Sequence, residues 1–186
     1  MNAWNGPLCQ GLDSALEWAR ANDEVGAVVI TGAGRAFCAG ADLSAGGDTF
    51  SESGTARGAA DDVAARTPKV LPWDVPKPVI AALNGHAVGV GATYALACDM
   101  RIIADRAKIA FVFARRGMLP ELGCHAILPN VVGLSNASDL LLSGRPVLGT
   151  EAASLGLASL SLPTEEVLDA AILRAREMAQ LSAPVS

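Results

Sequence analysis

The sequence predicts an α/β fold with mostly parallel strand pairing. Short apolar runs rich in β-branched residues alternate with stretches in which apolar residues recur at helical spacing. About half of the residues are apolar (51%) and 18% are charged, which is typical of a compact domain and not of a disordered chain. Because 186 residues are enough to bury one core, we expect a single domain over residues 1–186.

The first part of the chain is expected to hold two helices and one strand. Leu8, Leu12 and Leu16 recur at helical spacing, and Pro7 suits the first turn of a helix. Expected here are a helix over roughly 7–21, a buried strand over 25–31, a tight turn over 32–37, a long polar loop over 44–58 and a helix over 59–71.

The second part continues the alternation of strands and helices. Pro120 and Glu121 are expected to open a helical segment that Pro129 interrupts and Gly133 closes. Expected strands cover 78–83, 100–104, 108–113 and 157–162, and expected helices cover 92–97, 120–133, 135–142, 150–153 and 164–181.

Two strand–loop units carry glycines where a ligand could approach the backbone. The strand at 78–83 leads through Asn84-Gly85 to Gly89-Val90-Gly91, and the strand ending at Ile30 leads into TGAGRAFCAGADLS at 31–44. A glycine has no Cβ to keep a ligand away, and the first N–H groups of a helix have no partner within the helix. We therefore expect an enzyme that holds a carbonyl oxygen between these two loops.

Composition argues against several other classes of protein. The net charge of −5 argues against a general nucleic-acid-binding protein, because no basic face accumulates. One local basic cluster is either a solvated edge or a phosphate contact; it consists of Arg101, Arg106, Lys108, Arg115 and Arg116. No apolar run reaches the ~18 residues of a membrane span, and no secretory signal opens the chain. Four cysteines without C-x-x-C spacing and two histidines predict reduced thiols, a cytoplasmic location and no metal site.

Two nucleotide or hydrolase motifs are incomplete. The segment GAGRAF follows a strand, but Phe37 stands where a dinucleotide-binding loop needs a third glycine or an alanine. No G-x-S-x-G sequence is present, which disfavours an α/β-hydrolase with a serine nucleophile.

Longer motifs point to one family. The segments AFCAGADLS at 36–44 and NGHAVGVG at 84–91 occur in order with CDMRIIADRAKIAF at 98–111, RRGMLPELGCHAILPNVVG at 115–133 and SGRPVLGTEAASLGL at 143–157. Together they resemble the crotonase superfamily (enoyl-CoA hydratase/isomerase family) along essentially the whole chain. The resemblance implies a crotonase-like ββα superhelix. Family domains usually have a strand pair before this region and helices after it, so we expect a chain shortened at both ends, in which full activity is in doubt.

The resemblance also implies where a substrate would bind. The backbone N–H groups of Ala41 and Val90 would form an oxyanion hole for an acyl-CoA thioester; the alternative is that the glycines only permit tight turns. The backbone around Ala39 and Leu43 would bind the adenine of CoA, and Arg35 would lie near its phosphates. Asp42 belongs to the same motif, with local capping of the turn as its other interpretation.

Two departures from the family pattern decide the expected chemistry. Thr93 and Phe113 occupy the positions at which family hydratases carry glutamates, and neither moves a proton at neutral pH. Glu121, within LPELGC, instead resembles the single acid/base of the superfamily's enoyl-CoA isomerases. One carboxylate is enough for a 1,3-proton shift, and the apolar neighbours of Glu121 are expected to raise its pKa. The alternative is a surface glutamate in the first turn of a helix.

The favoured interpretation is therefore an enoyl-CoA isomerase. Left open are an enoyl-CoA hydratase (a lyase), a hydrolase or dehalogenase, and a silent acyl-CoA-binding subunit. His86 is expected to be structural, and His125 and Cys124 to be packing residues. CoA would enter as part of the substrate, with no separate cofactor. The family implies fatty acid metabolism, and a homotrimer or hexamer if the expected missing ends are present.

Overall fold

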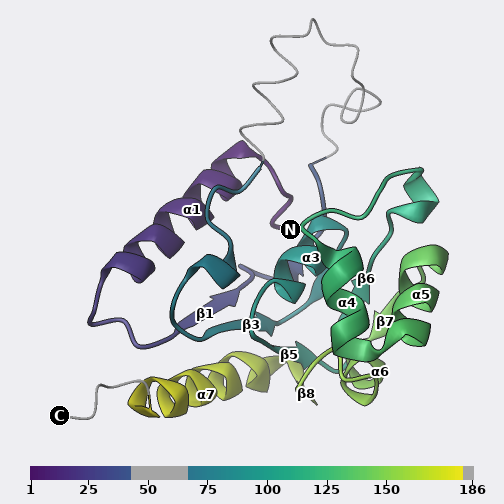
Figure 1. Cartoon of the computed structure of the whole chain (residues 1–186). Coiled ribbons are helices and arrows are strands. Elements are labelled where there is room, and N and C mark those ends of the chain that lie inside the picture. Colours follow the sequence, from purple (N-terminus) through teal and green to yellow (C-terminus); the bar gives the residue numbers. More distant parts are fainter. Residues whose placement is uncertain (43–66, 182–186) are drawn as a thin grey trace, which may run out of the picture.

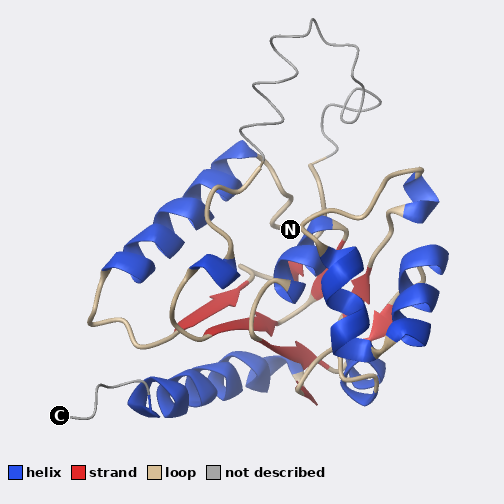
Figure 2. Cartoon of the chain, in the orientation of Figure 1, coloured by secondary structure: helices blue, strands red, loops and turns tan. Residues whose placement is uncertain are grey.

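The computed structural model describes residues 1–42 and 67–181 of the chain. Two four-stranded sheets form its centre, and helices flank them (Figures 1 and 2). The strands are β1 Val28–Thr31, β2 Ala36–Cys38, β3 Val79–Leu83, β4 His86–Val88, β5 Met100–Ala104, β6 Lys108–Ala110, β7 Val147–Leu148 and β8 Leu160–Leu162. The α-helices are α1 Gly6–Ala21, α3 Val90–Leu96, α4 Cys124–Val132, α5 Leu134–Ser143, α6 Gly149–Ser154 and α7 Val167–Leu181, and short 3₁₀ turns lie at Pro72–Asp74, Ala114–Arg116 and Thr164–Glu166.

From β1 to β6, successive strands of the chain alternate between the two sheets. The first sheet has the order β1-β3-β5-β8 with every pair parallel, and the second has the order β2-β4-β6-β7 with only β6 and β7 antiparallel. A strand of the first sheet is thus followed by a strand of the second, as in β3, β4 and then α3. This strand–strand–helix order agrees with the ββα arrangement that the family resemblance implies, and the predicted α/β class with mostly parallel pairing is confirmed.

The core lies between the sheets and under the flanking helices. All five residues of β3 are buried, and Ile102 and Ile103 of β5 are at most 1% exposed. Helix α7 packs along β1, β3 and β5, and Figure 1 shows it running beneath the first sheet. Every residue of α3 is buried, which the small side chains Gly91, Ala92 and Ala95 permit. No helix in the described ranges is long and apolar enough to cross a membrane.

Most of the expected elements are present with shifted ends. The helices expected over 7–21, 150–153 and 164–181 correspond to α1, α6 and the turn at Thr164–Glu166 followed by α7. The strand expected over 108–113 ends at Ala110, and the helix expected to begin at Ser135 begins at Leu134 after Gly133. The loop expected over 44–58 and most of the helix expected over 59–71 lie outside the described residues; 67–71 are not helical.

The prediction for residues 120–133 was wrong in two respects. Helix α4 begins at Cys124, and Glu121 precedes it, because Leu122 (φ 48°) and Gly123 (φ 64°) adopt left-handed backbone conformations. Pro129 does not interrupt the helix. Its missing N–H deprives the carbonyl of the exposed residue His125, four positions earlier, of a partner, and an exposed carbonyl has water available as a donor.

Candidate functional site

The two glycine-containing loops lie side by side at the carboxyl ends of neighbouring strands. Strand β2 pairs in parallel with β4, and Cys38 is in register with Ala87. The chain leaves β2 through Ala39-Gly40-Ala41 and leaves β4 through Gly89-Val90. Because paired parallel strands end at the same edge of a sheet, these two loops start from adjacent points.

Glycine is required where the loops approach each other. A Cβ on Gly40 would lie 3.1 Å from the carbonyl oxygen of Val88, and Gly40 has a φ of +95°. A Cβ on Gly91 would lie 2.6 Å from the Cβ of Cys38 and 2.7 Å from its carbonyl oxygen. A side chain at either position would push the loops apart, so the close approach is set by the glycines.

The backbone around Ala41 is held by residue Trp4. The Trp4 N–H donates to the carbonyl of Gly40 (2.8 Å), and the Asp42 N–H donates to the carbonyl of Trp4 (3.0 Å). In this parallel bridge the N–H and C=O of Ala41 point away from Trp4. Within residues 1–42 and 67–181, the Ala41 N–H has no backbone acceptor.

Val90 contributes the second free amide. It is the first residue of α3, after Gly89 (φ 56°, ψ −121°), and the N–H groups of a first helical turn have no acceptor within the helix. The N–H groups of Ala92 and Thr93 both donate to the carbonyl of Gly89. The N–H of Val90 has no backbone acceptor among the described residues. Two unpaired amide donors thus follow two neighbouring strands, an arrangement that can stabilise an oxygen atom on which negative charge develops.

Aromatic packing links the two loops from the inner side. The rings of Trp4 and Tyr94 lie 5.0 Å apart, and Tyr94 lies one turn after Val90 on α3. The Tyr94 hydroxyl is the buried side-chain polar atom without a hydrogen-bond partner in the described part of the chain. Burial raises the pKa of this hydroxyl, so it stays neutral. The Trp4–Tyr94 contact therefore joins the strand beside Ala41 to the helix that carries Val90.

The residues predicted to bind CoA are only partly placed. Arg35 is exposed at the turn between β1 and β2, and its guanidinium lies 3.9 Å from the sulfur of Met1. Ala39 is half-buried, and its N–H donates to the carbonyl of Met1 (3.2 Å). Asp42 is half-buried beside Asn5. Leu43 lies outside the described residues.

Glu121 lies in a turn and not in a helix. Its carbonyl accepts the N–H of Cys124 (3.0 Å), and Leu122 and Gly123 form the left-handed centre of that turn. The residue is exposed, yet the protein around its carboxyl desolvates it and raises its pKa. Water that reaches the exposed carboxyl limits the size of this increase in pKa. The charge of Glu121 in turn helps burial to raise the pKa of the Cys124 thiol to about 11.

The packing of two helices relates the Glu121 turn to the helix that begins at Val90. Helix α4, which starts three residues after Glu121, packs against α3, which starts at Val90. Ala41 and Val90 therefore belong to adjacent loops, and Glu121 belongs to the turn that leads into the helix beside α3.

The two positions matched to hydratase glutamates hold no acid or base. Thr93 is 1% exposed, and its hydroxyl donates to the carbonyl of Val90 at 3.1 Å. Phe113 is 4% exposed and belongs to the core. His86 is exposed, and its Nδ1 accepts the N–H of Lys108 (3.0 Å), which agrees with the expected structural role.

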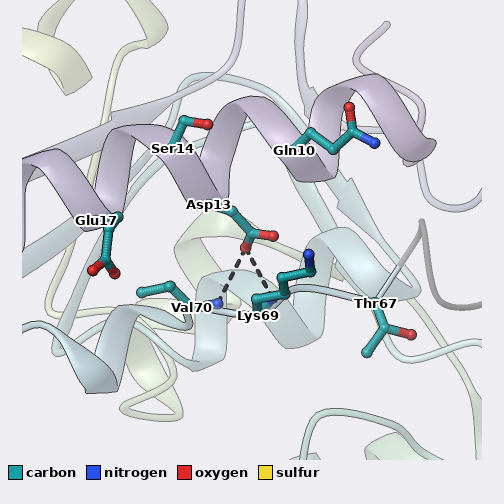
Figure 3. A pocket seen from close by; sticks show the side chains of 7 residues that line it. All are labelled: Gln10, Asp13, Ser14, Glu17, Thr67, Lys69 and Val70. Atoms are coloured by element: carbon teal, nitrogen blue, oxygen red, sulfur yellow. Dashed lines mark hydrogen bonds between the residues drawn. The ribbon is translucent and has the colours of Figure 1, made fainter.

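A separate groove of about 630 Å³ lies between α1 and the segment 67–70. Figure 3 shows Asp13 reaching from α1 to this segment, where its carboxylate accepts the N–H groups of Lys69 (3.0 Å) and Val70 (3.2 Å). None of the predicted site residues is among the described residues that line it, which are Gln10, Asp13, Ser14, Glu17, Thr67, Lys69 and Val70.

Sequence reasoning missed three asparagines that hold the loops. Asn84 joins the turns after β1 and β3, because its side chain bonds to Gly32 (N–H 3.1 Å, C=O 3.0 Å) and Gly34 (2.7 Å). Asn2 donates to carbonyls of Ala33, Ala36 and Phe37, at 2.8–3.2 Å. Asn5 caps α1 and contacts Asp42. For Asn84 the Asn-Gly pair was an available signal. The carbonyl partners of Asn2, and Asp42 as the partner of Asn5, are more than thirty residues away in sequence.

Comparison with known proteins gives a consistent answer. The family profile for enoyl-CoA hydratase/isomerase matches residues 1–185. A probable enoyl-CoA hydratase of Mycobacterium bovis is 35% identical over 184 residues, covering 98% of this chain and 69% of its own length. The human mitochondrial enoyl-CoA hydratase domain-containing protein 2 is 39% identical over 150 residues, covering 77% of this chain and 48% of its own.

Solved structures agree with the sequence relatives. The crystal structure of a probable enoyl-CoA hydratase/isomerase from Mycobacterium abscessus matches with a TM-score of 0.79 and 34% identity, covering 99% of this chain and 66% of that one. The chain thus spans about two thirds or less of the length of these relatives.

Proposed function

Because the chain belongs to the enoyl-CoA hydratase/isomerase family, we propose that it takes an enoyl-CoA thioester and shifts its double bond. The observation that carries the proposal is a pair of amide N–H groups, those of Ala41 and Val90, that follow two paired strands and have no backbone acceptor among residues 1–42 and 67–181. Enolisation of a thioester places negative charge on its oxygen. Each preorganised amide donor is typically worth about 3 kcal/mol to such a transition state.

The proposed reaction is a 1,3-proton transfer. The Glu121 carboxylate takes a proton from C2 of the thioester, and the electron pair of the C–H bond moves into the dienolate. The two amides stabilise the oxyanion, and protonated Glu121 returns the proton at C4. The reaction consumes no water and no oxidant, so the carboxylate ends as it began.

The raised pKa of Glu121 supports this role. A carboxyl that accepts a proton in one step and donates it in the next works best when its pKa is closer to the working pH than that of a free glutamate. Leu122, a non-glycine residue held at φ 48°, lies directly beside it, and backbone strain of this kind is concentrated at functional sites.

Hydration is the second candidate, because relatives are named enoyl-CoA hydratases. Adding water across a double bond with two carboxylates would need acids at positions 93 and 113, which hold a hydrogen-bonded threonine and a core phenylalanine. The described residues thus favour the isomerase among the family's reactions.

A substrate panel tests the proposal. The full chain is incubated with 2-enoyl-, 3-enoyl- and saturated acyl-CoA thioesters, and products are separated by mass and ultraviolet absorption. We expect 3-enoyl thioesters to gain the absorption of a conjugated 2-enoyl thioester at unchanged mass. A gain in mass of one water would indicate hydration, and free CoA would indicate hydrolysis. Tight binding with no product would indicate a silent acyl-CoA-binding subunit.

The CoA-phosphate contact is tested separately. Arg35→Ala should weaken binding of a saturated acyl-CoA and make it less sensitive to salt, because one exposed charge pair to phosphate is lost. Equal affinities for the variant and the parent would remove Arg35 from the site.

A further inference from the structure

Asn5 uses both ends of its side-chain amide. Its Oδ1 accepts the N–H of Leu8 (3.1 Å) as the N-cap of α1, and its Nδ2 donates to Oδ2 of Asp42 (3.3 Å). The asparagine amide carries its acceptor and its donor on two separate atoms, so this one uncharged side chain caps the helix and contacts Asp42 at the same time. Serine and aspartate also cap helices well, so capping alone does not require an amide here.

The Asp42 contact lies at the loop that carries the Ala41 amide. Trp4, the residue before Asn5, holds the backbone of Gly40 and Asp42 on either side of Ala41. Asn5 adds a side-chain contact to the same segment, residues 40–42. Together these contacts fix the peptide groups that flank Ala41 on the side facing α1, and they leave its N–H pointing to the opposite side.

We propose that Asn5 is a positioning residue for the Ala41 oxyanion donor, acting through the carboxylate of Asp42. Its amide restrains Asp42, and the restrained strand keeps the Ala41 N–H aimed at the thioester oxygen. The inference rests on the proposed function. It assigns to the start of α1 a part in the site that lies beyond the two glycine loops.

Two substitutions separate the contact from the cap. Asn5→Ser keeps an N-cap oxygen and removes the amide Nδ2 that donates to Asp42. We expect kcat for the thioester reaction to fall about fivefold, with KM within about twofold, because a misaimed oxyanion donor weakens the transition state more than the ground state. Thermal stability should change little, since the cap is kept.

Asn5→Asp adds a pH-dependent readout. Asp42 is the one titratable group that contacts the Asn5 side chain among the described residues. At neutral pH two carboxylates would face each other, and the loss of kcat should exceed that of Asn5→Ser. As the pH falls, one shared proton restores a hydrogen bond, so kcat relative to the parent should recover. A purely structural role for Asn5 predicts no such recovery of kcat at low pH.

Reversing the pair is the rescue experiment. Asn5→Asp combined with Asp42→Asn exchanges donor and acceptor, and it should recover kcat relative to both single variants, each measured alongside. Asn22→Ser is the matched control: Asn22 lies at the other end of α1, where its Oδ1 accepts the N–H of Glu24 (3.0 Å). Its kcat should equal that of the parent.

Amide NMR makes the test independent of turnover. In Asn5→Ser the Ala41 amide resonance should shift, and the Asp42 N–H, bonded to Trp4, should exchange faster with solvent. Unchanged amides together with unchanged kcat would overturn the inference, and so would losses that match those of Asn22→Ser. If the parent turns over no thioester, the proposed function fails, while the amide measurements still decide the role of Asn5.

Discussion

The amide-donor loops and the Glu121 turn are built in opposite ways. The loops after β2 and β4 are fixed by paired strands, by Gly40 and Gly91, and by buried neighbours such as Cys38. Glu121 lies in an exposed turn that one backbone bond closes across Leu122 and Gly123. The donors are backbone groups that any side chain leaves in place, whereas the proposed acid/base is a single replaceable side chain. A family can therefore keep its oxyanion site while the reaction changes.

The largest effect is expected for Glu121→Gln. Glutamine keeps the size of the side chain but accepts no proton, so the isomerase rate should fall by about two to four powers of ten. Binding of a saturated acyl-CoA should be retained, because the amide donors are untouched. Steady-state kinetics and calorimetry on the same preparation make the comparison. A near-parental rate would remove Glu121 from the chemistry.

The next largest loss of activity is expected when a side chain is added where the two loops approach each other. Gly40→Ala places a Cβ near the Val88 carbonyl at a positive φ, and we expect kcat to fall by about 10²–10³, as when an oxyanion donor is lost. Gly34→Ala is the control, because Gly34 also has a positive φ (74°) but open space around it. That variant should lose about 1 kcal/mol of stability and keep its kcat. Equal losses of kcat in both would show that backbone strain, and not the loop approach, matters.

The pH dependence sharpens the contrast. Desolvation raises the pKa of Glu121 above the ordinary 4.5, so the acid limb of the activity profile should lie above that value and vanish in Glu121→Gln. The same increase in pKa also makes the stability of the fold depend on pH. Between the ordinary pKa and the raised one, the folded chain binds more protons than the unfolded chain, so stability falls as pH rises through this window.

Chemical unfolding of the parent and Glu121→Gln across this pH range measures the linkage. The parent should lose stability relative to Glu121→Gln as pH rises, by well under about 1 kcal/mol, because the residue is exposed. A parent that instead gains stability over the same range would contradict the raised pKa.

At Leu122 the expected effects are on stability. Leu122→Gly relieves the left-handed strain at φ 48° but adds freedom to the unfolded chain, so stability should change by less than about 1 kcal/mol. Leu122→Val puts a β-branched residue at the same position and should destabilise by about 1–2 kcal/mol. Differential scanning calorimetry of both variants checks the order. A more stable Leu122→Val would mean that the turn changes its shape.

The sequence by itself determined the class of fold and the two loops. The strand at 79–83 is a continuous apolar run whose burial on both faces follows from composition, and the glycines at 89 and 91 predict a strand-to-helix turn. The family motifs are local in sequence, so they single out Ala41, Val90 and Glu121 without any knowledge of which distant residues meet. The roles of these residues as donors and acid/base stay predictions.

Only the tertiary structure decided how these parts meet. Strands β2, β4 and β7 are two or three residues long, too short for a periodic pattern, and they exist because neighbouring chain supplies their hydrogen bonds. The left-handed conformation at Leu122, which moved the start of α4 to Cys124, runs against the local preference of leucine. The bonds from Trp4 and Asn5 to residues 40–42 span more than thirty positions, and a local pattern carries no information about a partner that only folding brings near.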